Sequence, residues 1–409
     1  MPTLAFLGLA PLVVFAVILR PRAAVLGAVP VLMLPFTLDV GGFAYQFVLL
    51  ALLEIGIILG SWRRLREFAL LVVLIAVSAS MLVVSYLFNS REVVSDSVAR
   101  SGLVALLLCL GAVLAVALAA PNPLRMLQLV AISGAASSTY SSLIAQVSVS
   151  GRLTSGELNA NSLGHVAAIS IVALVAISWL GKSPWWLLLA LPSAYILFST
   201  HSRASFIIVA VGIGVFVLSG LTRRLRVVVS IGAAVVILAA VVVQQATGIA
   251  AFTAGRSEQK AEGSTEQRGE LLQIALGLIL QNPIAGVGFR SFPDYSYEVF
   301  HFGFNTHNDY VRLAVEAGVP TLLCVLAIVL VPLFAAHGKG TLQRIGTPVV
   351  AATAVSFLFG NTMSLLAVSL PFWFTVGLFW SQRAPRPAVF EFIGNPDHSH
   401  ARSLPTLTR

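Results

Sequence analysis

Charged residues are scarce in this chain of 409 residues. Asp, Glu, Lys and Arg together supply 10% of the sequence, whereas hydrophobic residues supply 58%. Soluble globular domains carry roughly 25% charged residues, so the composition excludes that class. The mean hydropathy of +0.93 agrees with this conclusion. The sequence therefore predicts an integral membrane protein.

Cysteine is also rare. The chain contains 2 cysteines, Cys109 and Cys324, and both fall within apolar runs. No CxxC or Cys/His spacing accompanies them, which indicates packing thiols rather than a disulfide or a metal site. The polar segments assigned below to the outer face lack DxD and HExxH motifs and carboxylate clusters that would hold Mg²⁺, Mn²⁺ or Zn²⁺. We expect no metal and no cofactor.

Apolar runs long enough to cross a lipid bilayer recur from one end of the chain to the other. A helix of about 20 residues crosses the hydrocarbon layer and satisfies its own backbone hydrogen bonds. We therefore predict an all-α polytopic fold with about 12 or 13 transmembrane helices. The expected spans are 3–19, 23–38, 42–60, 68–88, 102–120, 124–146, 162–180, 184–200, 203–220, 227–247, 311–335, 346–361 and 364–381.

The basic surplus of +9 lies in short loops between alternate pairs of apolar runs. This is the positive-inside pattern of cytoplasmic loops, and it argues against nucleic-acid binding. By elimination, residues 90–101, 147–161, 200–203 and 248–310 face outward. We expect one integral membrane domain over 1–409, a large outer loop at 248–310 and a cytoplasmic tail at 382–409. The basic loop residues are Arg63, Arg64, Arg66, Arg223, Arg224, Arg226, Lys339, Arg344, Arg383 and Arg386.

The outer segment 248–310 contains the run STEQRGELLQIALGLILQNP, which has the signals of an amphipathic helix. Ser264 and Gln267 form a capping-box pattern, and Asn282-Pro283 is a stop signal. We expect this helix to lie at the outer membrane boundary. Its apolar stripe is Leu271, Leu272, Ala275, Leu278 and Ile279.

Two arginines stand out on the predicted outer side. Arg268 precedes Leu272 by four residues, which places its guanidinium on the apolar stripe, where it can meet an anion. It can also pair with Glu270 or reach lipid headgroups. Arg203 begins an apolar run after the polar step STHS, and it either extends to the interface or takes part in a site.

His307 lies at the expected water boundary, beside Thr306 and Asp309, which form a helix-start pattern. That pattern favours a structural role for Asp309. A neutral imidazole near its reference pKa can exchange a proton, although a lone histidine can also serve only to bind a neighbouring loop. The run GVGFRSF at 286–292 lacks the features of a phosphate loop and predicts a tight turn.

Residues 151–165 add polar groups to the same side. Asn159 and Asn161 either cap a helix or bind sugar hydroxyls, and capping is favoured for Asn161. With Arg152 and Asn308, they complete the set of expected substrate-binding residues. Two guanidiniums suit the phosphate oxygens of an anionic lipid-linked substrate, and the imidazole can accept a hydroxyl proton.

Four segments in order, GRLTSGELNANSLG, THSRASF, EQRGELL with NPIAGVGFRSF, and NTHNDYVRLAVEAGVP, resemble the O-antigen ligase and polymerase superfamily over about 150–320. The resemblance implies a GT-C-like fold in the bacterial inner membrane, with the active site on the periplasmic side. It implies inverting transfer of a glycan from undecaprenyl diphosphate to lipid A core, to another glycan chain or, in relatives, to protein. The lack of metal-binding motifs predicts that this transfer is metal-independent. The catalytic residues that the resemblance implies are His307, Arg268 and Arg203, with His307 as the base or as the group that aligns the acceptor hydroxyl.

Two alternatives remain open from the sequence. A polysaccharide polymerase uses the same donor chemistry with a lipid-linked glycan as acceptor. A transporter of lipid-linked glycan would instead place charges near the middle of the bilayer. Glu54 is the residue within a predicted span that bears on this alternative.

Overall fold

The computed structural model describes residues 2–33, 39–40, 43–87, 93–147, 152–155, 158–220, 258–335 and 340–383. Within these ranges, strands form only two short antiparallel hairpins. β1 (Asp39–Val40) pairs with β2 (Phe43–Ala44), and β3 (Gln146–Val147) pairs with β4 (Leu153–Thr154). The all-α prediction is confirmed.

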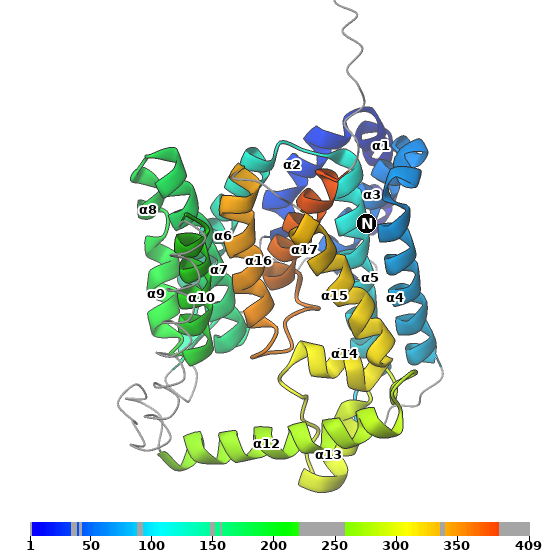
Figure 1. The fold of residues 1–409 in the computed structure, drawn as a ribbon, viewed down its shortest axis with the longest axis vertical. Helices are drawn as coiled ribbons and strands as arrows, with labels where there is room; N and C mark the ends of the chain where they lie inside the picture. The colour runs from blue at the N-terminus through cyan, green and yellow to red at the C-terminus, as the bar shows by residue number, and fades with distance from the viewer. Residues whose placement is uncertain are drawn as a thin grey trace, which may run out of the picture.

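The first half of the chain forms a series of apolar helices, coloured blue to green in Figure 1. They are α1 (Pro2–Leu19), α2 (Pro21–Met33), α3 (Tyr45–Gly60), the 3₁₀ helix η1 (Trp62–Phe68), α4 (Ala69–Leu87), α5 (Asp96–Ala119), α6 (Pro123–Ile144), α7 (Ala160–Gly181), α8 (Trp185–Leu188), α9 (Leu191–Ser199) and α10 (Arg203–Gly220).

The second half begins with helices outside the bundle and then returns to it. The elements are α12 (Glu258–Gln281), α13 (Phe292–Phe300), α14 (Asp309–Ala317), α15 (Val319–Ala335), the π-helical turn η3 (Leu342–Gly346), α16 (Thr347–Ser356) and α17 (Leu366–Ser381). The predicted span 227–247 and most of the tail 382–409 lie outside the described residues.

The bundle is built around α17, which packs along α5, while α7 packs against α6, α10 and α16. Glycines let the helices approach closely, as is common where small residues line membrane helix interfaces. Gly377 of α17 lies against the Val113 carbonyl and Val116 of α5, and Gly212 of α10 lies against Val172 and Ala352.

Four of the described helices are long and apolar enough to cross a membrane, and six shorter apolar helices accompany them. The four are Trp62–Leu87, Asp96–Ala119, Ala160–Gly181 and Arg203–Gly220. With the predominance of helix, this supports the predicted class of polytopic α-helical membrane protein.

One of the predicted spans is wrong as a single helix. The run 311–335 is divided at Gly318, whose φ of +84° ends α14 before α15 begins. A side chain at Gly318 would collide with the Ile284 carbonyl oxygen, so glycine is required there. The predicted span 184–200 corresponds to the apolar helix Trp185–Ser199, in which a turn separates α8 from α9.

The two ends of α5 have different surroundings. At its C-terminus, Arg22 Nε donates to the Ala119 carbonyl at 3.3 Å and Arg64 Nη1 donates to the Leu118 carbonyl at 2.6 Å. Basic groups are favourable at a helix C-terminus. Near its N-terminus, Gly102 lies against the guanidinium of Arg290. Arg22 and Arg64 therefore lie at the opposite end of α5 from Arg290, which belongs to the segment after α12.

Glu54 lies inside the bundle rather than facing lipid. Its side chain is buried, and its carboxylate contacts Gly111 of the neighbouring α5. The helix pair α3 and α5 therefore encloses this carboxyl group, which gives Glu54 a packing contact with α5.

One layer of helices lies across an end of the bundle (Figure 1). The helix α12 ends at Gln281, as the Asn282-Pro283 signal predicts, but it begins at Glu258, so the predicted start at Ser264 is wrong. Leu271, Ala275 and Leu278 are buried in a separate apolar cluster with Val287, Phe292 and Val315. Most of the predicted apolar stripe therefore packs on α13 and α14, whereas Leu272 remains exposed.

Candidate active site

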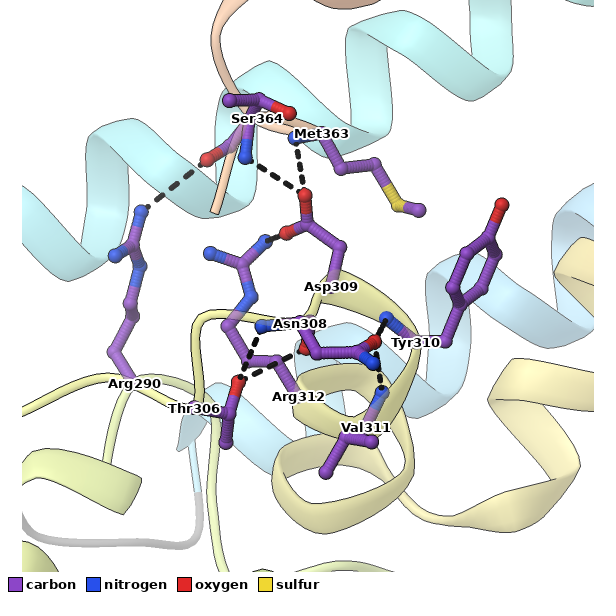
Figure 2. A network of polar contacts seen from close by, with 10 residues as sticks. Arg290, Thr306, Asn308, Asp309, Tyr310, Val311, Arg312, Met363 and Ser364 are labelled. Atoms are coloured by element: carbon purple, nitrogen blue, oxygen red, sulfur yellow. Dashed lines mark hydrogen bonds and ion pairs between the residues drawn. The ribbon is translucent and has the colours of Figure 1, made fainter. Parts of the chain in front are cut away.

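The short helix α14 sets the position of His307, which immediately precedes its cap. The N-cap is Asn308, whose Oδ1 accepts from the backbone N–H groups of Tyr310 and Val311 at 3.0 and 3.2 Å. The predicted cap by Thr306 and Asp309 is therefore wrong. Thr306 Oγ1 instead donates to the Asn308 carbonyl at 2.9 Å and so stabilises the turn before the helix (Figure 2).

His307 adopts a left-handed backbone conformation, with φ of 54°, and its side chain is half-buried. Such a conformation is uncommon for a residue other than glycine, and functional sites often contain it. Burial lowers the pKa of His307, and the positive charge of Arg268 lowers it further. The expected pKa near the reference value is therefore wrong, and the imidazole stays neutral to lower pH.

The positive charge of Arg268 lowers the pKa of His307, and α12, which carries Arg268, packs against α14, which His307 precedes. Arg268 lies on α12 one turn before Leu271, whose buried side chain holds this face of the helix against α14. The guanidinium itself is exposed. The structure thus brings together two of the three residues that were expected to be catalytic.

Arg203 is the first residue of α10, and its side chain is exposed. The neighbouring Ser202 and Ser205 are buried, and both lie beside Gly164 near the start of α7. The next residue, His165, lies against Gly360 in the loop between α16 and α17. That loop, residues 357–365, also contacts α14, as described below.

The expected substrate-binding residues on the 151–165 segment have internal partners. Asn159, rather than Asn161, is the N-cap of α7, because its Oδ1 accepts from the backbone N–H groups of Asn161 and Ser162 at 3.0 Å each. Asn161 Oδ1 accepts from Arg152 Nη2 at 2.6 Å, and Arg152 Nε donates to the Thr200 carbonyl at 2.8 Å. These contacts hold the segment against the chain just before Arg203.

Buried polar atoms without hydrogen-bond partners gather around the loop 357–365. Both ring nitrogens of the buried His165 are among them, within the described part of the chain. Buried polar groups usually have a protein or water partner, so this end of the bundle offers hydrogen bonds to water or to a polar substrate. Such atoms there include Ser202 Oγ, Ser205 Oγ, Asn361 Oδ1 and Thr362 Oγ1, as well as Arg290 Nε and Arg312 Nη1 in the neighbouring charged group.

A buried group of charges lies next to His307, and the sequence reasoning missed it. Asp309 and Arg312, on α14, form an ion pair with 2.7 Å between Oδ1 and Nη2, and both side chains are almost fully buried. Glu316, one turn later, is also buried. The opposing Arg290 donates from Nη2 to Ser364 Oγ at 3.3 Å (Figure 2). The sequence did contain a signal for this group. In DYVRLAVE, residues 309–316, the charged residues Asp309, Arg312 and Glu316 are three and four positions apart and therefore lie on one face of a helix.

The turn that contains Arg290 packs on the end of α14. Gly286 and Gly288 have φ of +70° and +117°, in agreement with the predicted tight turn. The backbone N–H groups of Val287 and Gly288 donate to the carbonyls of Val315 and Glu316 at 2.8 and 3.1 Å. The turn therefore folds the chain that leaves α12 back onto α14.

The fold and this site define a class: a polytopic α-helical membrane protein with a helical layer across one end of the bundle. This layer carries Arg268 and packs against the short helix that His307 precedes. Residues 185–326 match the family model described as O-Antigen ligase. The matched segment runs from α8 into α15 and includes Arg203, Arg268 and His307. This match confirms the resemblance to the O-antigen ligase superfamily.

The family match supports a glycan-transfer function of the ligase or polymerase type. It also supports a lipid-linked glycan as the kind of substrate. A comparison with curated proteins found no match.

Proposed function

We propose that the protein transfers a preassembled glycan from undecaprenyl diphosphate to lipid A core, on the periplasmic side of the bacterial inner membrane. The observation that carries the proposal is that α12, which carries Arg268, packs against α14, which His307 immediately precedes, within the segment that matches the family. A histidine whose pKa is lowered is neutral at physiological pH and can accept a proton.

In the proposed reaction, an acceptor hydroxyl oxygen attacks the anomeric carbon of the donor. The bond between that carbon and the diphosphate oxygen breaks, and the diphosphate leaves with the electron pair. The hydroxyl proton passes to His307. A single displacement of this kind inverts the configuration at the anomeric carbon.

Arg203 and Arg268 are proposed to bind the diphosphate and to stabilise the negative charge that develops as it leaves. Guanidiniums present paired donors that match phosphate oxygens. Their exposure leaves them accessible to a lipid-linked anion. Because two fixed positive charges are available, the transfer needs no metal ion. Loss of one such donor typically lowers kcat by roughly 100- to 1,000-fold.

The loop 357–365 is proposed to line the space between these groups. It contacts α7 beside Arg203 through Gly360 and α14 beside His307 through Thr362. Its unpartnered polar atoms supply hydrogen bonds for glycan hydroxyls or for water. The outer loop 248–310 then acts as a cover that carries Arg268, and the tail 382–409 lies in the cytoplasm.

The test uses purified protein and a glycan linked to undecaprenyl diphosphate, offered separately with lipid A core and with a second donor molecule. A ligated lipid A core, visible as a slower band on a gel, is the expected result. Longer lipid-linked chains without ligation would instead assign a polymerase. Counterflow of labelled donor across proteoliposomes without any covalent product would contradict glycan transfer and favour a transporter.

A further inference from the structure

We infer that Asp309, Arg312, Glu316 and Arg290 act together as a positioning device for His307. This inference rests on the proposed function, because it concerns the same reaction. None of the four is proposed to touch the substrate. They act through the backbone of α14 and of the loops on either side of it.

The charges of the four groups balance, since two guanidiniums face two carboxylates. Each group acts electrostatically on the pKa of Arg290, which lies at about 10 because burial lowers it most and Arg312 lowers it further. Exposed fractions of 0% for Asp309 and 1% for Arg312 and for Glu316 leave no room for a bulky anion. Asp309, Arg312 and Glu316 are enclosed and Arg290 is half-buried, so this balanced set of charges serves the protein itself rather than a bulky ligand.

Asp309 joins the start of α14 to the loop between α16 and α17. Its Oδ2 accepts from the backbone N–H groups of Thr362 and Met363 at 2.7 and 2.8 Å. Its own N–H donates to the Phe357 carbonyl at 2.8 Å. Figure 2 shows the Asp309 carboxylate directed toward this loop, with the Arg312 guanidinium beside it. Asp309 is two residues from His307, so this junction fixes the segment that carries the imidazole.

Glu316 joins the other end of α14 to the turn before α13. Its carboxylate accepts from the backbone N–H of Arg290, and its carbonyl accepts from Gly288 and from Ser85 Oγ. Arg290 has φ of 64°, a left-handed conformation that these contacts hold in place. Its guanidinium then reaches Ser364 in the same loop that Asp309 holds. Both ends of α14 are thus tied to neighbouring segments.

A positioning role matters because transfer depends on the place of the imidazole relative to the diphosphate. A displacement of about 1 Å can lower a rate by roughly 100-fold. Diphosphate binding is assigned to Arg203 and Arg268, which lie outside the four-residue group. Disturbing the group should therefore lower kcat and leave the KM for the donor unchanged.

The principal test is D309N, which keeps the shape and one acceptor oxygen but removes the charge. D294N is the matched control, because Asp294 also lies in the first turn of a helix and accepts the backbone N–H of a distant residue, Val93, at 2.8 Å. We expect kcat of D309N to fall at least 10-fold, with donor KM within about 2-fold of the wild-type value. The assay is run well below the melting temperature of each variant, so that only folded protein contributes.

A kcat for D309N equal to that of D294N, or a raised donor KM with unchanged kcat, would overturn the positioning role. An unpaired buried arginine can prevent folding, so D309N/R312Q, which removes both charges, is the second variant. Its kcat should be at least 5-fold below wild type, since a neutral amide holds the loop less firmly, and a wild-type kcat would overturn the inference. Absence of product from wild-type protein is a different result, because it contradicts the proposed function itself.

Discussion

Two pairs of arginines lie at the same end of this molecule and differ in almost every physical respect. Arg203 and Arg268 are exposed at or near the start of the apolar parts of their helices, whereas Arg312 is almost fully buried and Arg290 lies in a turn against α5. This second pair, in which Arg312 is buried and Arg290 half-buried, faces two buried carboxylates. A guanidinium at the surface is available to an external anion, and one enclosed with carboxylates organises the protein around it. Residue type alone therefore does not assign a role.

The largest effect is expected at His307, because the exposed arginines and the buried charged group are both proposed to act with it. H307A should lower transfer by roughly 100- to 10,000-fold, since a positioned general base contributes that much. Diphosphate binding should remain, because the arginines are unchanged. Product formation and donor binding are measured on the same preparation. H301A is the matched control, because His301 has a similar left-handed φ of 54° and is exposed beyond α13.

If H307A retained most of its activity, the histidine would not be the base. The two pairs of arginines would then no longer be related through a shared catalytic residue. Loss of activity together with loss of donor binding would also contradict the account, since it would assign His307 to binding.

The next largest effects are expected for alanine and lysine substitutions of Arg203 and Arg268, which test whether the exposed arginines bind the diphosphate. R203A and R268A should lower kcat roughly 100- to 1,000-fold, whereas R203K and R268K should retain part of it, because lysine keeps the charge and loses the paired donors. Melting temperatures should change little for all four variants. Equal losses for lysine and alanine would mean that geometry, rather than charge, dominates.

The pH dependence of the rate tests the contact between Arg268 and His307. The base must be deprotonated, so activity is present above the pKa of His307 and is lost as the pH falls through it. Because burial and Arg268 both lower that pKa, the acid limb of kcat/KM should lie below the ordinary histidine value of about 6.5. The residual activity of R268Q should show an acid limb at higher pH, because a positive charge has been removed.

Arg125 provides the control for that profile, since it is exposed at the start of α6, at the end of the bundle where α5 terminates. R125Q should leave the acid limb where it is in the wild type. An R268Q profile identical to wild type would remove the electrostatic contact from the account.

Variants of Asn308 test whether this residue only caps α14 or also binds substrate. N308A should cost about 1 kcal/mol of stability, because an N-cap is lost, and N308S should recover most of it. If Asn308 only caps α14, N308S should also keep the wild-type rate in the gel assay. N122S is the matched control at the cap of α6, where the Asn122 side chain accepts from the backbone N–H of Arg125. A stable N308S with little activity would instead return Asn308 to the substrate-binding set.

A chelator should have the smallest effect. Because arginines are proposed to neutralise the leaving diphosphate, excess EDTA should leave the initial rate unchanged. A loss of activity that added Mg²⁺ restores would show that a metal ion shares this task.

The sequence was sufficient for the fold class and for most helix positions, because length and apolarity decide them. It failed at Gly318, where apolar residues continue across the boundary between α14 and α15 and hide a backbone break. It also misassigned the caps of α7 and α14, since Asn159 and Asn161, like Thr306 and Asn308, are polar residues two positions apart, and only geometry selects one of each pair. These errors arise where several nearby residues fit the same pattern, either the apolar pattern of a helix or the polar residue of a helix cap.

The candidate site was only partly accessible to sequence reasoning. Arg203 was identifiable at the start of an apolar run, and Arg268 and His307 in the polar segment between apolar runs, and the superfamily resemblance named all three. The partners of Asp309 were not identifiable, because Thr362 and Met363 contribute backbone N–H groups that no side chain reveals. Arg290 was also missed. The run GVGFRSF was interpreted only as a tight turn, because of its glycines, and no role was predicted for its arginine.

The most direct test measures binding of undecaprenyl diphosphate, without a glycan, to purified wild-type protein and to R203A, R268A and R125A. The account predicts affinities at least 10-fold weaker for R203A and R268A, and wild-type affinity for R125A. Equal affinities for all four proteins would contradict the claim that the two exposed arginines hold the diphosphate.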